Sequence, residues 1–517
     1  MTITDNLLKK EKENPFIKDF LDESHLKPKN YSDIDEAKVL AYYYGNILKY
    51  TKETGFICYQ NNHWIESETI PHRFLGELTN FQLSHANKLI ESFKNEMKQK
   101  NVWIDFTRHH TFSYSEEIQK LFSSYIDALA YKKFITSRRN SNNIEATLNE
   151  VKAIIEIDSN LIDNKPYLLT TPEATFDLRK GILGKEENNP KNYITKITKV
   201  SPSDKGEKLW KKTLKNIFSN NNELIEYVQK ICGLALIGQV MQEGLIICLG
   251  EGGNGKSTFW NTIARVLGNY SGIIASDTLI KSKYNDKKFE LAELKGKRLI
   301  IASELEQDSI LDEALIKRIC SSDDIYAEKK YKSPFYFTPS HTLILYTNHL
   351  PKISSIDDGI WDRILIIPFN NRFRNKKKEK KNYSNYLFFY AGGAILKWLI
   401  EGAKKAIDSN FKLTKPKIVV DAISKYQYKN DVFKRFINDY CVLDKSYKES
   451  SSLLYQTYCY YCKSYDEVAK NNYDFTYLLK KNNLKKRIIK RKSYICGIKI
   501  KEDFKKDFLE RSKDYEF

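Results

Sequence analysis

The fold of the chain is decided by the stretch Gly250-Glu251-Gly252-Gly253-Asn254-Gly255-Lys256-Ser257-Thr258. An apolar run, residues 244–249, precedes it, and residues 259–267, which are apolar at helical spacing, follow it. The pattern G-x-x-x-x-G-K-[ST] requires this context of a strand, a glycine-rich turn and a helix start. We therefore predict an α/β fold in which this phosphate loop (residues 250–258) joins a buried strand to a helix.

The phosphate loop predicts binding of a nucleoside triphosphate through all nine of its residues. Its glycines allow successive backbone N–H groups to point inward around phosphate oxygens, beside a helix N-terminus. Lys256 is expected to reach the β and γ phosphates, and the Ser257 hydroxyl is expected to hold Mg²⁺. The competing interpretation, a chance match in a surface turn, does not account for the flanking strand and helix.

The composition indicates several domains and a basic surface. The 517 residues are enough for about three to four domains, each with its own core. Lysine and arginine number 85 and aspartate and glutamate 66, which gives a net charge of +19. Such an excess is typical of proteins that bind nucleic acid or an acidic membrane surface. A solvated basic surface in a lysine-rich proteome explains the charge equally well, so charge alone does not decide.

Neither a membrane span nor a zinc site is predicted. The most apolar region, residues 231–249, is interrupted by polar side chains, and residues 1–13 show no signal peptide. The eight cysteines are scattered, as in a reduced protein. Cys459 and Cys462 form a C-x-x-C pair with no second pair, and we expect buried thiols there. The prediction is a cytoplasmic protein with no membrane partner.

The segment before the phosphate loop is predicted to be mainly helical behind a loosely docked arm, residues 1–32. Short strands are expected on both sides of an Asn61-Asn62 turn and within residues 167–200, including 193–200. Helices are expected at residues 33–50, 81–98, 115–130, 143–157, 208–218 and 222–240.

Two apolar runs beyond the phosphate loop end in polar side chains suited to nucleotide hydrolysis. The first ends at Glu304, whose carboxylate would hold the metal ion and polarise the attacking water. The second ends at Asn348, whose amide would bond the γ-phosphate or that water. An edge strand entering a charged helix and a turn asparagine are the alternatives. When the upstream phosphate loop is considered with it, the position of Glu304 strongly favours the role in hydrolysis.

Two basic features are candidates to contact phosphate. Arg363 leads into another apolar run, where a guanidinium would stabilise transferring phosphoryl charge, including that on a neighbouring subunit. A salt-bridged surface arginine is the alternative. Between two apparent strands of residues 326–337 lies a tip that combines phosphate attraction with an aromatic face. A solvated basic turn is equally compatible with this tip, which consists of Lys329, Lys330, Tyr331 and Lys332.

The last hundred residues change in character. Helices are expected at residues 432–440, 453–465 and 475–481, and a basic hairpin follows them. This order suggests a winged-helix DNA binder. Residues 480–492 hold eight basic residues and no acid, although a solvated charged face is the alternative. The candidate DNA contacts in the hairpin are Lys485, Lys486, Arg487, Lys490, Arg491 and Lys492.

From about residue 33 to the C-terminus, the motifs and their order resemble the superfamily III helicases of the phage/plasmid primase C-terminal family, relatives of the poxvirus primase-helicase. The stretch 250–258 is similar to motif A, 299–304 to motif B, and 343–348 to motif C with its sensor asparagine. Residues 323–338 resemble the segment with the pore hairpin, and Arg363 resembles the arginine finger.

The resemblance implies a AAA+ core that assembles as a ring, usually a hexamer, with ATP and Mg²⁺ between subunits. Hydrolysis would move the Lys330 hairpins along one DNA strand in the pore while the winged helix binds duplex. The implied role is a replication initiator helicase of a phage, plasmid or chromosomal island in the cytoplasm of a bacterial host. The implied domains are an arm (1–32), an α+β domain (33–206), the AAA+ domain (207–412) and a winged-helix-like domain (425–517).

The chain departs from the resemblance in two places. Thr171-Pro172-Glu173-Ala174 stands where the family has an Asn-Gly turn. The segment before Asp33 is too short for the primase-polymerase of many relatives, so a separate primase or polymerase is expected as a partner. The alternatives are a AAA+ ATPase that loads or remodels replication proteins, a nucleotide-regulated origin-binding scaffold, and a helicase that acts on RNA.

Overall fold

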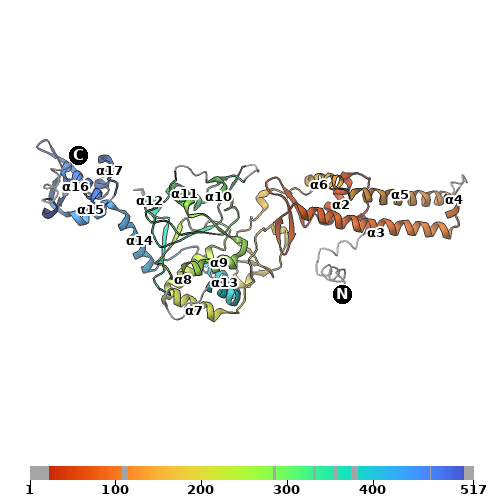
Figure 1. Ribbon diagram of the computed structural model, residues 1–517, viewed down its shortest axis with the longest axis horizontal. Coiled ribbons are helices and arrows are strands. Elements are labelled where there is room, and N and C mark those ends of the chain that lie inside the picture. The colour runs from red at the N-terminus through yellow and green to blue at the C-terminus, as the bar shows by residue number, and fades with distance from the viewer. Residues whose placement is uncertain are drawn as a thin grey trace.

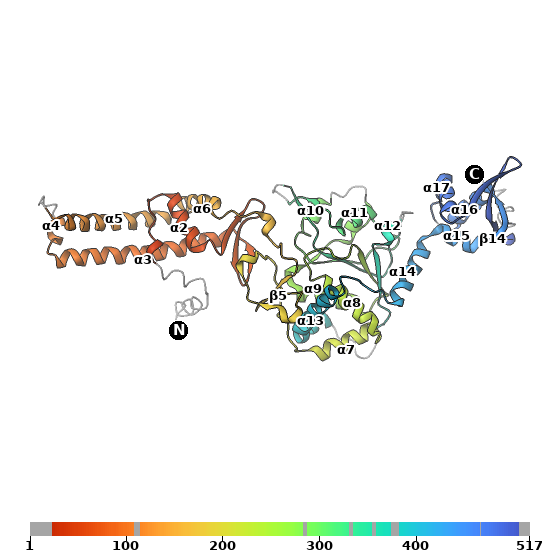
Figure 2. The ribbon, with the colours of Figure 1, turned by 180° about the vertical axis from the view of Figure 1, so that it is seen from behind.

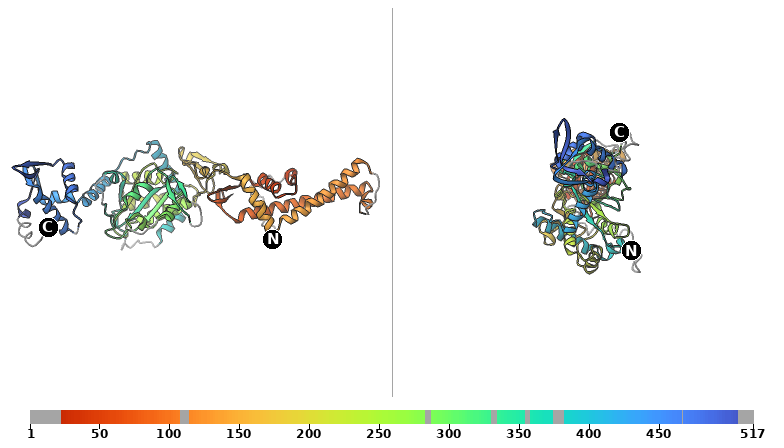
Figure 3. Two further views of the ribbon diagram at one scale, coloured as in Figure 1. Left: turned by 90° about the horizontal axis from the view of Figure 1, so that it is seen from above. Right: turned by 90° about the vertical axis from the view of Figure 1, so that its left-hand side faces the viewer.

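The computed structural model describes residues 23–107, 114–282, 287–329, 334–353, 358–373, 382–465 and 467–505. Three units follow one another along a long axis (Figure 1). A helical arm near the N-terminus lies at one end, a sheet covered by helices lies in the middle, and a small unit lies at the other end. The view from above shows the same order (Figure 3). Among the described residues, no helix is long and apolar enough to cross a membrane.

The central unit is built on a five-stranded parallel sheet in the order β13-β7-β12-β9-β8. Its middle strands are near-continuous apolar runs because both of their faces are covered. The predicted α/β class is therefore observed as a parallel sheet with helices against it. The strands are β7 (Leu245–Leu249), β8 (Ser271–Ile273), β9 (Leu299–Ser303), β12 (Thr342–Thr347) and β13 (Ile364–Pro368).

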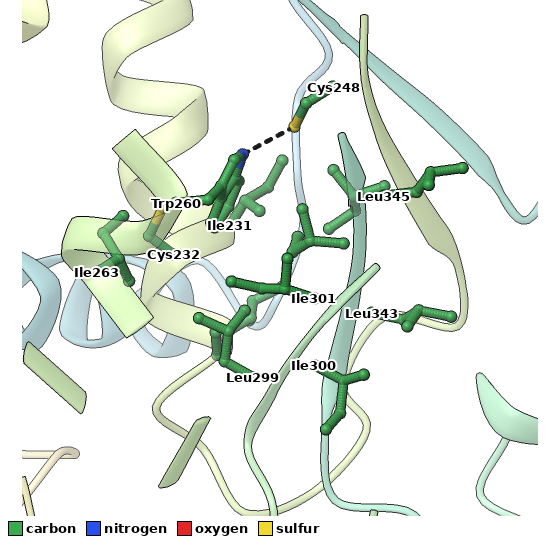
Figure 4. Close-up of a cluster of buried hydrophobic side chains, with 14 of the residues drawn as sticks. Ile231, Cys232, Cys248, Trp260, Ile263, Leu299, Ile300, Ile301, Leu343 and Leu345 are labelled. Carbon is green, nitrogen blue, oxygen red and sulfur yellow. Dashed lines mark hydrogen bonds between the residues drawn. The ribbon is translucent and has the colours of Figure 1, made fainter. Parts of the chain in front are cut away.

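Helices α8, α9 and α13 pack together beside this sheet (Figures 1 and 2). In the core, the Trp260 indole N–H of α9 donates to the Cys248 sulfur of β7 at 3.0 Å (Figure 4). Burial raises the pKa of the Cys248 thiol to about 12, so this cysteine stays neutral. The helices of this unit are α7 (Glu207–Ile217), α8 (Asn222–Leu234), α9 (Lys256–Leu267), α10 (Lys288–Ala292), α11 (Glu313–Ile319), α12 (Asp358–Trp361) and α13 (Tyr383–Asp408).

Two small sheets accompany the central one. Strands β10 (Ile325–Ala327) and β11 (Phe335–Phe337) form an antiparallel hairpin stem. Strands β4 (Leu168–Thr170), β5 (Thr175–Asp177) and β6 (Lys185–Glu186) form a second antiparallel sheet.

The N-terminal unit is an α+β arrangement with a long helical arm. Helices α3 and α5 run side by side, with α4 at their far end (Figure 1). Asn61 and Asn62 both have left-handed backbone conformations, as the turn between β2 and β3 requires. The elements are α2 (Asp33–Tyr44), β1 (Leu48–Thr51), β2 (Gly55–Gln60), β3 (His63–Glu66), α3 (Thr69–Gln99), α4 (Trp103–Thr107), α5 (Glu116–Arg138) and α6 (Ser141–Ile155).

Several elements predicted for this half of the chain differ from the structure. The helix predicted to reach residue 50 ends at Tyr44. The Gly45 N–H donates the last helical hydrogen bond to the Ala41 carbonyl oxygen, and residues 48–51 then form strand β1, which pairs with β2. The helix predicted to reach residue 240 ends at Leu234, after which residues 235–238 turn. Residues 193–200 form no strand, since their N–H groups bond scattered partners instead of a ladder, among them the side chains of Asp163 and Asn269.

The C-terminal unit follows helix α14 (Lys417–Asn430) and has its own hydrophobic core. The three predicted helices are present, and the predicted basic hairpin is formed by the last two strands. Cys462 is buried and Cys459 half-buried on the middle helix. In this unit one strand, β14, was not predicted. The elements are α15 (Val432–Tyr440), β14 (Cys441–Ser450), α16 (Ser451–Ser464), α17 (Asn472–Lys481), β15 (Lys485–Ile489) and β16 (Lys492–Ile500).

Candidate functional site

The phosphate loop leaves β7 and enters α9 in a conformation that only particular residues permit. Gly253 and Gly255 have φ values of 80° and 88°, which a side chain would disfavour. The buried Asn254 amide donates to the carbonyl oxygen of Phe369, just beyond β13, at 2.9 Å. The Phe373 N–H donates to the Gly253 carbonyl oxygen at 2.8 Å. The segment after β13 therefore fixes the shape of the loop, a role that the sequence pattern did not reveal.

Lys256 points into the loop and is buried there. Its ammonium donates to the Gly250 carbonyl oxygen, to Asn254 Oδ1 at 3.1 Å and to Asn348 Oδ1 at 2.9 Å. Burial lowers the pKa of Lys256 below its ordinary value, while nearby Cys248 and Glu304 act in the opposite direction. The lysine is thus held by oxygen acceptors at the point where phosphate oxygens would compete for it.

Glu304 and Asn348 follow neighbouring strands at the same edge of the sheet. Because β12 lies between β7 and β9, the ends of all three parallel strands converge beside the phosphate loop. Glu304 is exposed, and its backbone has a left-handed φ of 54° held by a bond from its N–H to the Tyr346 carbonyl oxygen. Such strain in a non-glycine residue is concentrated at functional sites.

The donor set at this edge suits a hard divalent cation. The exposed Ser257 at the start of α9 and the exposed Glu304 both offer oxygen, which is the ligand that Mg²⁺ prefers. Glu304 directly follows β9, and Asn348, which directly follows the neighbouring strand β12, accepts a hydrogen bond from Lys256, so Glu304 lies at the edge of the sheet beside the loop. These residues fit a magnesium ion that also binds phosphate.

Arg363 lies away from these residues. It immediately precedes β13, and its carbonyl accepts from the Leu245 N–H at the start of β7. The five residues of β13 separate it from the loop edge, roughly 16 Å at 3.3 Å per residue. Its guanidinium pairs with Glu243 at 2.6 Å and donates to the Gly359 carbonyl oxygen at 3.1 Å. Within one subunit, the structure does not bring Arg363 to the phosphate loop.

The two predicted DNA contacts are described to different extents. In the β10–β11 hairpin, Lys329 is half-buried, whereas residues 330–333, with Lys330, Tyr331 and Lys332, lie outside the described residues. In the C-terminal hairpin all six predicted basic residues are exposed, and none forms an ion pair within the described parts of the chain. The left-handed turn at Lys490 and Arg491 reverses that hairpin.

Replacing Gly250 with alanine is expected to distort the loop, because the new methyl group would overlap the Asn254 amide and the Phe369 carbonyl oxygen. We expect a loss of about 1–3 kcal/mol in stability, typical of overpacking, and weakened nucleotide binding. Thermal unfolding and titration with a fluorescent ATP analogue measure the two effects. Gly76→Ala on α3 is the control, since nothing lies within 4 Å of its added methyl group. Equal stability and equal nucleotide binding of the two variants would contradict the close approach of Gly250 to Asn254 and Phe369.

Two protein-family models match the chain. A model described as "D5 N terminal like" matches residues 37–219, and one described as "Family of unknown function (DUF5906)" matches residues 248–363. The second therefore covers the phosphate loop, Glu304, Asn348 and Arg363.

Curated viral proteins are similar over larger parts of the chain. A "Putative helicase" of Acanthamoeba polyphaga mimivirus is 27% identical over 445 residues, covering 81% of this chain and 44% of that protein. A "Putative helicase" of Invertebrate iridescent virus 3 is 24% identical and covers 60% and 37%. "Primase D5" of Fowlpox virus is 25% identical and covers 56% and 37%. The chain thus spans less than half the length of these relatives.

Among solved structures, the NrS-1 C-terminal region is similar at 15% identity, with a TM-score of 0.35, covering 58% of this chain and 77% of that one.

Proposed function

Because the chain belongs to the D5-like primase-helicase family, we propose that it is an ATP-dependent replicative DNA helicase of a mobile element. The observation that carries the proposal is the bond from the Lys256 ammonium to the Asn348 amide oxygen. It links the phosphate loop to the end of β12, next to β9, the strand that precedes Glu304. A nucleotide bound to the loop would therefore lie beside the residues that follow both β9 and β12.

In this proposal each residue has a separate task at the nucleotide. The loop N–H groups and Lys256 bind phosphate, and the lysine exchanges its three oxygen acceptors for phosphate oxygens. Mg²⁺, held by Ser257 and Glu304, would neutralise phosphate charge. Glu304 would also polarise the attacking water, and Asn348, released by the lysine, would orient it.

The position of Arg363 supports a site shared between subunits. A guanidinium at the opposite end of the sheet is too far to act on its own loop, but it can face the loop of the next subunit in a closed ring. We therefore propose a AAA+ core of superfamily III that assembles as a hexamer. The order of the five parallel strands, with the Asn348 strand beside the phosphate-loop strand, supports this core.

The basic hairpins supply the proposed contacts with DNA. The tip between β10 and β11 would hold one strand in the pore, since its lysines attract phosphate and its tyrosine can stack on a base. The order of helix, strand, two helices and a hairpin in the C-terminal unit supports a winged helix. Its exposed basic hairpin would bind duplex DNA.

A forked-duplex assay tests this function. We expect ATP, but not ADP, to drive displacement of a labelled strand by the full chain with Mg²⁺. ATP hydrolysis without displacement of DNA or RNA strands would favour a protein remodeller or loader. DNA binding without ATP hydrolysis would favour the origin-binding scaffold. Displacement of RNA strands alone would identify RNA, and not DNA, as the substrate.

Lys330→Ala separates a helicase from a remodeller. We expect it to abolish strand displacement and to retain DNA-independent ATP hydrolysis, because the tip contacts the strand and not the nucleotide. Lys415→Ala, which removes an exposed lysine before α14, is the control and should unwind normally. Normal unwinding by Lys330→Ala would exclude the tip from translocation.

A further inference from the structure

Helix α17 exposes two tyrosines that the fold does not use. It buries Phe475, Leu478 and Leu479 in the C-terminal core. On the other side, Tyr473 and Tyr477 lie one helical turn apart with 83% and 54% of their surface exposed. Within the described residues neither ring packs against another aromatic ring. Two neighbouring exposed rings are informative, because single exposed apolar residues are common but grouped ones mark binding surfaces.

The C-terminal hairpin carries an exposed apolar side chain near its turn. Ile488 is 78% exposed, pairs with Ser493 on β16, and lies between Arg487 and the turn residues Lys490 and Arg491. An isoleucine in this position contributes nothing to the core. It lies beside Ile489 and its partner Ser493, but the cations Arg487, Lys490 and Arg491 lie within three residues of it, so it projects from a surface that attracts phosphate.

The positive charge of residues 472–492 favours a nucleic acid as the ligand of this region. Residues 472–492 contain eight basic residues and one acid, Asp474, which lies in the first turn of α17. Lys480 continues the exposed side of the helix beyond Tyr477 and leads to the first strand of the hairpin. The aromatic helix side and the basic hairpin are therefore adjacent along the chain, and both belong to one small unit (Figure 2).

Exposed tyrosine rings and an exposed isoleucine near the hairpin turn fit unpaired bases better than an intact duplex. A paired and stacked base hides its faces, whereas an unpaired base stacks on tyrosine. Isoleucine side chains act as wedges that separate base steps. We propose that the C-terminal unit binds the junction between duplex and single strand, with Tyr473 and Tyr477 stacking on opened bases and Ile488 wedged at the last pair. This inference rests on the proposed DNA helicase function and replaces simple duplex binding by fork recognition.

The test compares blunt duplex and forked DNA of the same sequence by fluorescence anisotropy, using the full chain without ATP. All variants carry Lys330→Ala, so that binding by the other hairpin is weakened. Tyr473→Ala with Tyr477→Ala should weaken fork binding by at least about 30-fold, from the loss of two stacked bases, and change duplex binding little. Replacement of both by phenylalanine should retain fork binding. A 2-aminopurine at the first unpaired position should lose fluorescence on binding, and the alanine variant should restore it.

Ile488→Ala is expected to weaken fork binding as well. The matched control is Leu443→Ala, since Leu443 is 56% exposed on the same sheet but pairs with Ile498, six residues from the start of β16. Equal losses on both DNAs, or no loss on either, would overturn the junction proposal. The latter result would assign the tyrosines to a protein partner. If the protein without any of these substitutions binds no DNA, the proposed function itself fails.

Discussion

Lys256→Ala is expected to reduce ATP hydrolysis by at least about 100-fold, as removal of a charged group that stabilises a developing oxyanion does. The lysine is buried in the loop, and its three acceptors all belong to the proposed nucleotide site. Alanine removes the only side-chain cation that the structure places inside the described loop. Steady-state phosphate release measures turnover, and titration with a fluorescent ATP analogue measures binding.

Glu304→Gln is the variant to compare with it. Glutamine keeps the size of the exposed side chain but cannot polarise water as a carboxylate does. We expect it to bind ATP and to hydrolyse it slowly, whereas Lys256→Ala should lose both properties. If Lys256→Ala hydrolyses ATP normally, the phosphate loop is not the catalytic site. If the two variants bind ATP equally well, the lysine does not hold phosphate.

Four of the five strands of the central sheet could be predicted, because burial on both faces leaves a continuous apolar run. The edge strand β8, none of whose residues is buried, was missed. β7, β9 and β12 are apolar runs, and each was located to within a few residues. β14 was missed because nine of its ten residues are polar, charged or exposed. They show no alternation of apolar and polar residues, so the sequence pattern is typical of a loop. Helix α3 begins at Thr69, twelve residues before the predicted start at residue 81. Its first turns bury Phe74, Leu75 and Leu78, but Pro71 and Gly76 are poor helix formers and obscure the helical pattern there.

The geometry of the site depends on strand order, which residue spacing does not contain. Lys256 and Asn348 are 92 positions apart, and they meet because β12 inserts between β7 and β9. The same parallel arrangement separates Arg363, although it lies only fifteen positions beyond Asn348. The chemistry of each residue was readable from its motif, whereas its distance from the others was not.

Arg363→Ala is expected to lower ATP hydrolysis by about 1,000-fold or more if it acts as an arginine finger. The arginine lies at the far end of β13, so its contribution should appear between subunits. Phosphate release should therefore be restored in part when Arg363→Ala and Lys256→Ala proteins are mixed and reassembled. In an equal mixture, about a quarter of the interfaces combine an intact loop with an intact arginine, since each ring interface is formed by two different surfaces.

The ion pair of Arg363 with Glu243 provides the control for this experiment. An exposed pair of this kind contributes about 0–1 kcal/mol, so Glu243→Gln should fold normally and should not reproduce a large loss. If Glu243→Gln loses as much ATP hydrolysis as Arg363→Ala does, the arginine acts by stabilising its own subunit through its ion pair with Glu243. If the mixture stays inactive while both variants still form rings, the two residues do not serve one site. Partial recovery by mixing, with an active Glu243→Gln protein, requires the nucleotide to lie between neighbouring subunits.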